Sequence, residues 1–182
     1  MFSNKFSQTS KTSIILYVIV FFTATGLSNI VPALPLYAKE LGANNFMIGG
    51  LISGFGLARA LTNIPSGILA DRINQKYLMQ AGLFVVIISS IAAAFVNSYY
   101  LLLFCRIIEG VGSSFFMVSA STVLNSIAPT HKRGQIMSYF TASILIGVIF
   151  GPSLGGLVIP LFGKSSPFLL YALMAFIGLI IT

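Results

Sequence analysis

The sequence predicts an all-α membrane protein with six transmembrane helices, because of its composition, the length of its apolar segments and the distribution of its charges. Apolar and aromatic residues (AVILMFWYC) make up 57% of the chain and charged residues only 7%. A soluble domain carries roughly 25% charged residues, because it needs a polar shell. A surface that faces lipid has no such need, so we expect a bilayer around most of this chain.

The apolar segments have the length that a membrane crossing requires, which is about 20 residues for roughly 30 Å of hydrocarbon. Short polar turns separate the expected helices, which cover residues 13–36, 46–69, 77–96, 99–127, 135–161 and 167–182. The last segment would span only about 24 Å, and no basic residue follows it. The sequence therefore predicts one six-helix transmembrane domain over residues 1–182 and a missing C-terminal half.

The ten Lys and Arg residues are scattered between apolar runs, whereas a nucleic-acid-binding protein gathers them in a patch. We therefore expect contact with membrane lipid and none with nucleic acid. Cytoplasmic loops carry an excess of such cations. With the N-terminus inside, the inner segments hold Lys5, Lys11, Arg72, Lys76, Lys132 and Arg133. Because the outer loops hold only Lys39 and Lys164, the pattern favours a multi-pass protein of the cell (plasma or inner) membrane with a cytoplasmic N-terminus.

A charged loop follows the second expected helix, where residues 67–76 read GILADRINQK. Gly67 would let another helix approach closely. Asp71 lies at the membrane edge and could pair with Arg72 or Lys76, or face the N-terminus of a neighbouring helix. A simple cytoplasmic loop with one carboxylate is the other interpretation, and the composition of the loop does not separate the two.

The fourth helix carries two charges in its interior, where residues 106–112 read RIIEGVG. Arg106 and Glu109 are three residues apart and share a helix face. Charges at this depth are costly and usually face the bundle interior or a wet cavity. They form either a neutralising ion pair that permits insertion or a pair that takes part in proton coupling.

Arg59 lies near the middle of the second helix and has no acidic residue within helical reach. Its partner would come from another helix, from water or from an anionic substrate. Glu109 is the only carboxylate deep in the six helices, so Arg59 could pair with it across the bundle. In the first helix, Asn29 either lines a cavity or hydrogen-bonds to a neighbouring helix.

The fifth helix contains a glycine pattern, where residues 147–156 read GVIFGPSLGG. Gly147, Gly151 and Gly155 recur every four residues and would form a smooth face for close helix packing. Pro152 removes a backbone donor and would bend the helix.

Residues 151–155 also match the G-x-S-x-G pattern of serine hydrolases. That pattern belongs on a strand-to-helix turn with a histidine partner, whereas here it lies in an apolar helix. The only histidine, His131, falls in an expected cytoplasmic loop. Since the sequence also lacks a metal-ligand cluster and a phosphate-binding loop, we expect no enzyme, no metal site and no cofactor.

Together these segments resemble the motifs of the major facilitator superfamily. The loop resembles the signature between helices 2 and 3 at Gly67, Leu69, Ala70, Asp71, Arg72 and Lys76. Asn74 replaces a glycine there, a mild change because Asn is among the few other residues that tolerate a left-handed turn. The fourth helix resembles the family pattern, with Glu109 where Gln is most common. The fifth helix resembles the antiporter motif at every fixed position, namely Gly147, Gly151, Pro152, Gly155 and Gly156.

The resemblance implies two inverted three-helix repeats and a secondary transporter that works by alternating access. It implies that the charged loop controls gating, and that the fifth-helix motif belongs to proton-coupled efflux (antiport) of small molecules. Glu109 would carry the proton, and Arg59, Asn29 and Arg106 would join it at the substrate cavity. The missing C-terminal half or a second copy would complete the protein. A half-size transporter acting as a homodimer and a non-transporting structural or regulatory membrane protein are the alternatives.

Overall fold

The computed structural model describes the backbone of residues 2–182 and the side chains from residue 11 onward. Its helices are α1 Phe2–Glu40, α2 Asn45–Arg72, α3 Gln75–Ala94, α4 Tyr99–Ile127, the 3₁₀ helix η1 Thr130–Lys132, α5 Arg133–Phe162 and α6 Ser166–Ile181. The predicted set of six α-helices is confirmed within this range. The predicted boundaries of the fourth helix are confirmed as well, whereas α1 is much longer than the expected segment 13–36.

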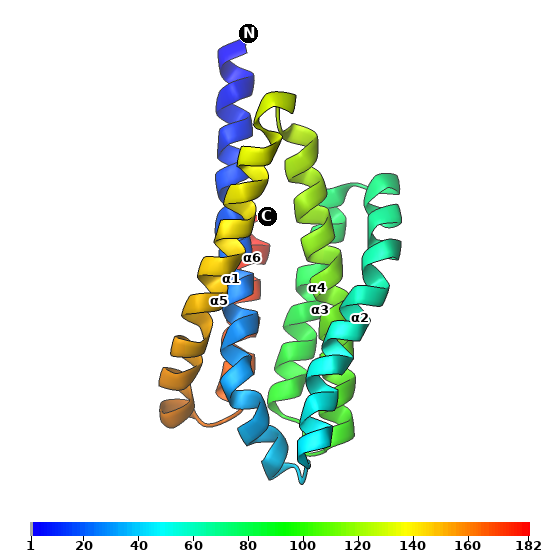
Figure 1. Cartoon of the computed structure of the whole chain (residues 1–182), viewed down its shortest axis with the longest axis vertical. Helices are drawn as coiled ribbons and strands as arrows, with labels where there is room; N and C mark the ends of the chain where they lie inside the picture. The colour runs from blue at the N-terminus through cyan, green and yellow to red at the C-terminus, as the bar shows by residue number, and fades with distance from the viewer. Residues whose placement is uncertain (1) are drawn as a thin grey trace.

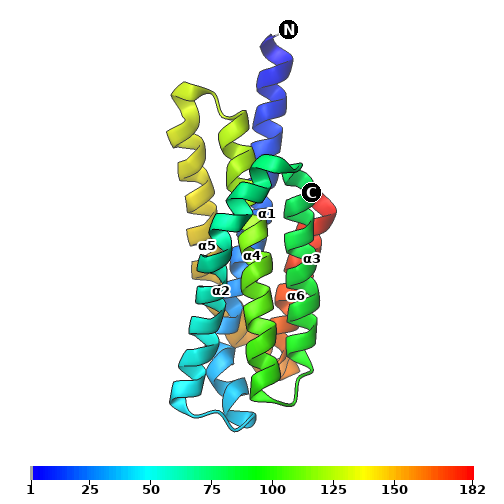
Figure 2. The ribbon, with the colours of Figure 1, turned by 90° about the vertical axis from the view of Figure 1, so that its right-hand side faces the viewer.

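The helices run alternately up and down (Figures 1 and 2). The start of α1 and the α2–α3 and α4–α5 turns lie at one end, and the other three turns lie at the opposite end. An ion pair between Lys164 and Glu40 joins the α5–α6 turn to the end of α1. Arg72 and Arg133 therefore share an end of the bundle, as the charge distribution predicts. The side chain of Lys5 lies outside the described residues, and the side of the membrane that each end faces stays a prediction.

The helix pairs show that the chain consists of two equivalent parts. α1 packs against α5 and α6, α4 packs against α2 and α3, and α3 packs against α6. Exchanging α1, α2 and α3 for α4, α5 and α6 reproduces the same set of pairs. Corresponding helices run in opposite directions, as α1 and α4 do in Figure 1. The fold is therefore two inverted three-helix repeats, as expected.

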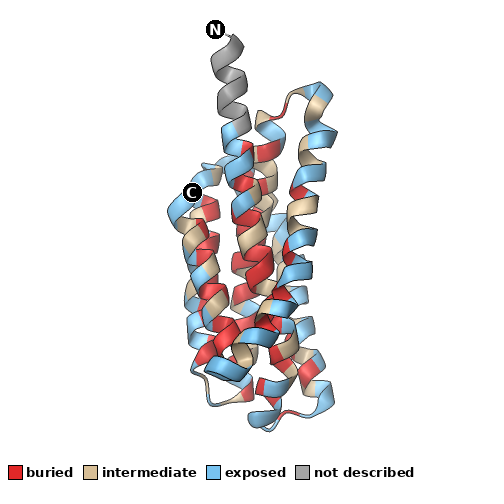
Figure 3. Cartoon of the chain, turned by 90° about the vertical axis from the view of Figure 1, so that its left-hand side faces the viewer, coloured by how far each residue is buried: buried red, intermediate tan, exposed pale blue. Residues whose placement is uncertain are grey.

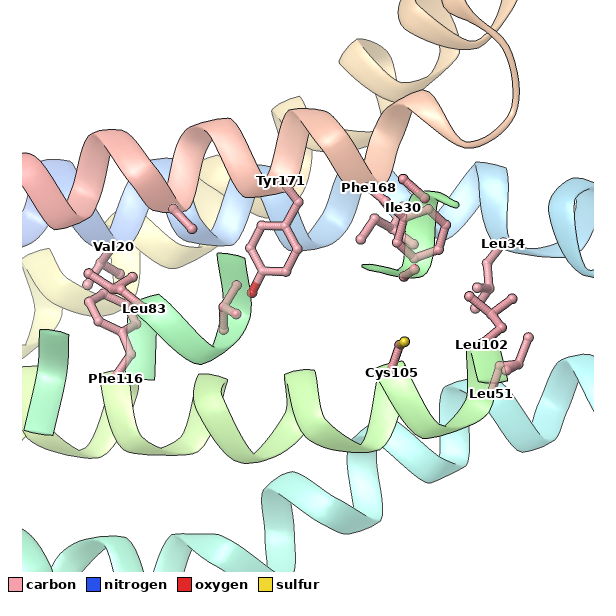
Figure 4. Packing of buried hydrophobic residues seen from close by; sticks show 14 of the residues in the cluster. Val20, Ile30, Leu34, Leu51, Leu83, Leu102, Cys105, Phe116, Phe168 and Tyr171 are labelled. Atoms are coloured by element: carbon pink, nitrogen blue, oxygen red, sulfur yellow. The ribbon is translucent and has the colours of Figure 1, made fainter. Parts of the chain in front are cut away.

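The core lies between α1, α3, α4 and α6. One buried cluster includes Val20 of α1, Leu83 of α3, Phe116 of α4, and Phe168 and Tyr171 of α6 (Figure 4). Buried residues follow stripes along the helices and do not cover them (Figure 3). This pattern suits a bundle in lipid, where close packing holds helices together and the outward faces stay apolar.

Five of the described helices, α1 to α5, are long and apolar enough to span a membrane, whereas α6 has only 16 residues. These helices differ in how much of their most apolar stretch is buried. The buried share is 50% in each of α1, α3 and α4, but 11% in α2 and 17% in α5. Exposed residues of α2 include Leu61 and Ile64, and those of α5 include Ile149 and Leu157. α2 and α5 therefore present apolar faces that the described part of the chain does not cover.

The α2–α3 connection is shorter than predicted. Asp71 and Arg72 belong to the last turn of α2, and only residues 73–74 separate it from α3. Asn74 does not use the left-handed conformation that Asn tolerates, because this residue has φ −62° and ψ 118°. Its side-chain oxygen accepts a hydrogen bond from the backbone N–H of Lys76 over 2.9 Å. Asn74 thus caps the N-terminus of α3, a role that favours Asn over Gly.

Candidate functional site

A buried ion pair lies within α4. The guanidinium Nη1 of Arg106 donates to Oε2 of Glu109 over 2.6 Å, and Ser90 of α3 donates to Oε1 over 3.0 Å. Arg106 is 5% exposed and Glu109 is 0% exposed. The structure therefore contains the neutralising pair, and the role of Glu109 in proton coupling stays a prediction.

Arg106 also binds α4 to α2. Its Cζ lies 4.5 Å from the centre of the Phe55 ring, a cation–π geometry. α2 can approach α4 this closely because Gly110 has no side chain. A Cβ at this position would lie only 2.5 Å from the carbonyl oxygen of Phe55. Phe55 and Ser90 were not predicted, since nothing in the sequence of α2 or α3 indicates which residues face α4.

Arg59 does not pair with Glu109, so the predicted pairing across the bundle is wrong in this conformation. Both carboxylate oxygens of Glu109 already accept from Arg106 and Ser90. Arg59 instead lines a cavity of about 110 Å³. Its walls come from all six α-helices and comprise Thr23, Ala24, Leu27, Ser28, Arg59, Leu83, Val86, Ser113, Phe116, Met117, Ile144, Val148 and Tyr171.

The other predicted cavity residues lie outside this lining. Arg106 and Glu109 are held in their own pair, and Asn29 is 0% exposed. The Nδ2 group of Asn29 donates to the carbonyl of Gly26 over 2.8 Å, while its Oδ1 has no hydrogen-bond partner among the described residues. Asn29 therefore packs inside the bundle, and the preceding Ser28 reaches the cavity in its place.

The fifth-helix motif has two faces. Gly147, Gly151 and Gly155 are buried against α1. A Cβ on Gly151 would collide with Ser28 Oγ and would lie 2.6 Å from the carbonyl oxygen of Thr25. Pro152 and Gly156 are exposed on the opposite side. The motif thus packs α5 onto α1 with one face and leaves the other without a partner in residues 11–182.

The charged end of α2 is exposed. Asp71, Arg72 and Lys76 are all exposed, and the expected pairing of Asp71 with either cation does not occur in the structure. A Cβ on Gly67 would meet no atom within 4 Å. The features that predicted a close helix contact and an ion pair are therefore present, but the described chain supplies neither partner.

A polar connection between α2 and α4 was not predicted. Ser114 donates to Oδ1 of Asn63 over 2.8 Å, and its oxygen lies 3.0 Å from that of Ser66. Ser66 and Ser114 are both 0% exposed. Isolated serines in apolar helices give no signal that distinguishes such a connection from intrahelical bonding.

Comparisons with known proteins agree with this architecture. The sequence profile described as Major Facilitator Superfamily matches residues 16–182. An uncharacterized MFS-type transporter of Methanocaldococcus jannaschii is 31% identical over 172 residues, which are 94% of this chain and 45% of that protein. The quinolone resistance protein NorA of Staphylococcus aureus is 29% identical over 147 residues, which are 81% of this chain and 38% of that protein.

The fold also matches a solved structure. The crystal structure of the peptide transporter POT in complex with sulfate superposes with a TM-score of 0.84 at 20% identity, over 94% of this chain and 37% of that one. At this identity the match concerns the fold alone. The chain spans less than half the length of each of these proteins.

Proposed function

Because this chain belongs to the major facilitator superfamily, we propose that it forms the N-terminal half of a secondary transporter that exports small molecules in exchange for protons. The main support is the pair of uncovered apolar faces on α2 and α5. Gly67 and Asp71 lie on or beside the uncovered face of α2, and the exposed Pro152 and Gly156 lie on α5. A second six-helix half, or a second copy of this chain, would cover these faces.

Asp71 acts in gating under this proposal. It is an exposed carboxylate at the end of α2 without an ion-pair partner in residues 11–182. A cation or a helix N-terminus of the second half would pair with it in one conformation and release it in the other. Arg72 and Lys76 would hold the same loop through contacts with lipid headgroups or with the second half.

Glu109 is the proton carrier of this half under the same proposal. The chain has three acidic residues, and the other two, Glu40 and Asp71, lie at helix ends. Burial favours the neutral form of a carboxylate and an adjacent cation favours the charged form. A conformational change that moved Arg106 would therefore shift Glu109 towards its protonated form.

The direction and the location are also part of the proposal. The complete fifth-helix motif and the similarity to NorA both support efflux over uptake. Six cations on the inner segments against two on the outer loops support a cytoplasmic N-terminus in the cell membrane.

A reconstituted transport assay tests the proposal. The complete encoded protein in proteoliposomes, given a pH gradient and a fluorescent quinolone, should move the quinolone against its concentration gradient until a protonophore is added. Glu109→Gln should abolish the response to the pH gradient. Glu40→Gln is the matched control, because Glu40 is exposed at the far end of α1 and should transport normally.

Three results would contradict the proposal in different ways. Proton-driven efflux that survives Glu109→Gln would remove the proton role from this residue. Transport without any dependence on the pH gradient would exclude antiport. Absence of transport for a broad panel of small molecules would favour a structural or regulatory membrane protein.

A further inference from the structure

Three hydrogen-bond donors from three helices line the same cavity and have no hydrogen-bond partner in residues 11–182. They are the guanidinium of Arg59 in α2, the hydroxyl of Ser113 in α4 and the hydroxyl of Tyr171 in α6. Ser113 is 4% exposed and Tyr171 is 2% exposed, whereas Arg59 is half-buried. The Tyr171 ring projects from α6 towards the middle of the bundle (Figure 4).

The remaining cavity hydroxyls behave differently. Thr23 donates to the carbonyl of Ile19 over 3.0 Å, and Ser28 donates to the carbonyl of Ala24 over 2.9 Å. Their donors are satisfied inside α1, as is usual for Ser and Thr in transmembrane helices. The donors at Arg59, Ser113 and Tyr171, which have no hydrogen-bond partner in residues 11–182, therefore form a distinct group that a ligand in the cavity can reach.

The cavity carries an uncompensated positive charge. Its lining contains Arg59 and no carboxylate. The carboxylate of Glu109 lies outside this lining, and its two oxygens already accept from Arg106 and Ser90. A charge at this depth in a membrane protein normally has a partner, and no side chain in residues 11–182 provides one for Arg59.

The rest of the wall is apolar. It consists of Ala24, Leu27, Leu83, Val86, Phe116, Met117, Ile144 and Val148. A ligand that fits this wall needs an apolar body, and a ligand that satisfies the three donors needs an acceptor group with negative charge. A carboxylate meets the second need, because it accepts several hydrogen bonds and binds a guanidinium strongly.

We propose that this cavity binds an amphipathic organic anion, with its anionic group on Arg59, Ser113 and Tyr171 and its apolar body against α3, α4 and α5. This inference rests on the proposed transport function and names the class of its substrate. A cationic ligand would meet the repulsion of Arg59. A neutral ligand would leave the charge of Arg59 without a partner.

Three fluorinated probes of nearly equal size separate these classes. The probes are 4-fluorobenzoate, 4-fluorobenzamide and 4-fluorobenzamidine, which are an anion, a neutral molecule and a cation. Their dissociation constants for the complete encoded protein in nanodiscs can be measured by ¹⁹F NMR relaxation, with empty nanodiscs as background. Since a hydrogen bond to a charged group contributes about 1.5–3 kcal/mol, benzoate should bind at least about tenfold more tightly than benzamide.

Substitutions assign this preference to the cavity. Arg59→Gln should remove the preference for benzoate, and Arg59→Lys should retain most of it. Ser113→Ala and Tyr171→Phe should each weaken benzoate several-fold and leave benzamide unchanged. Arg133→Gln, an equal loss of charge at the exposed start of α5, should have no effect. An unchanged thermal unfolding midpoint for each variant shows that the fold is retained.

Lipid composition separates two sources of the anion. If a lipid headgroup is the natural occupant, the benzoate preference should be present in phosphatidylcholine nanodiscs and lost in phosphatidylglycerol nanodiscs. If a soluble organic anion is the occupant, the preference should be present in both.

Equal affinities for the three probes, tighter binding of benzamidine, or a preference that survives Arg59→Gln would overturn the proposal. None of these results depends on a pH gradient, so each would leave proton-driven transport standing. Conversely, a benzoate preference in a protein that transports nothing would overturn the proposed function and leave the anion site intact.

Discussion

Arg106 and Glu109 form a closed pair inside α4, with 2.6 Å between Nη1 and Oε2 and with both side chains buried. The pair is neutral as a unit, which lowers the cost of placing two charges in the bundle. The carboxylate is also held by Ser90 of α3, and the guanidinium lies over the ring of Phe55 of α2. One pair of charges therefore connects three helices, and breaking the pair should lower the unfolding free energy of the bundle.

Glu109→Gln should destabilise the protein by about 3 kcal/mol, because it leaves the buried charge of Arg106 uncompensated. The double variant Arg106→Met/Glu109→Gln removes both charges and should regain most of this loss. Denaturant titration in detergent micelles measures both effects. Glu40→Gln should change the stability by less than about 0.5 kcal/mol, since its pair with Lys164 is exposed. A double variant that is less stable than Glu109→Gln would show that the pair is not the source of the effect.

Gly151→Ala should destabilise the α1–α5 contact by about 2 kcal/mol, a typical cost of overpacking. The added Cβ would meet Ser28 Oγ and would lie 2.9 Å from the backbone nitrogen of Asn29. Gly156→Ala is the matched control within the same motif, because a Cβ there meets no atom within 4 Å. Thermal unfolding midpoints of the two variants compare these effects directly. Equal losses of stability would mean that the buried face of the motif is not the packing face.

Most of the fold could be predicted from local patterns. Helix boundaries followed from apolar length and turn residues, and α4 at Tyr99–Ile127 was predicted to the residue because Ser98 and Pro129 flank it. The inverted repeats were not visible in the residues and came from the family resemblance. The length of α1 was missed because its N-terminal turns are polar, and hydrophobicity alone does not indicate that a helix continues beyond the apolar segment.

The site was less predictable, because it depends on which faces of different helices meet. The ion pair of Arg106 and Glu109 is local to one helix turn, and sequence spacing was enough to indicate it. The cavity depends on the rotation of six helices, and its lining includes Arg59 but not Asn29, Arg106 or Glu109. Tyr171 and Ser113 were missed because an isolated hydroxyl in an apolar helix carries no signal until its neighbours are known.

Asp71→Asn should separate gating from folding. Asp71 is exposed and forms no ion pair in residues 11–182, so the unfolding free energy should change by less than about 0.5 kcal/mol. Transport by the complete protein should fall at least about tenfold if Asp71 loses one charge-assisted contact in the second half. Measuring both quantities on the same preparation provides the test. A large loss of stability, or full transport activity, would be inconsistent with a gating contact outside this chain.

The Asn63–Ser114 hydrogen bond should contribute a small and measurable coupling between α2 and α4. The donor and acceptor lie 2.8 Å apart, and hydrogen bonds between transmembrane helices contribute about 0.6 kcal/mol on average. A double-mutant cycle with Asn63→Ala and Ser114→Ala should give a coupling energy of this size in denaturant titrations. The cycle of Asn63→Ala with Ser90→Ala is the control, because Ser90 bonds to Glu109 and shares no partner with Asn63. Coupling in the control cycle as large as that for Ser114 would mean that the effect spreads through the bundle and does not arise from this contact.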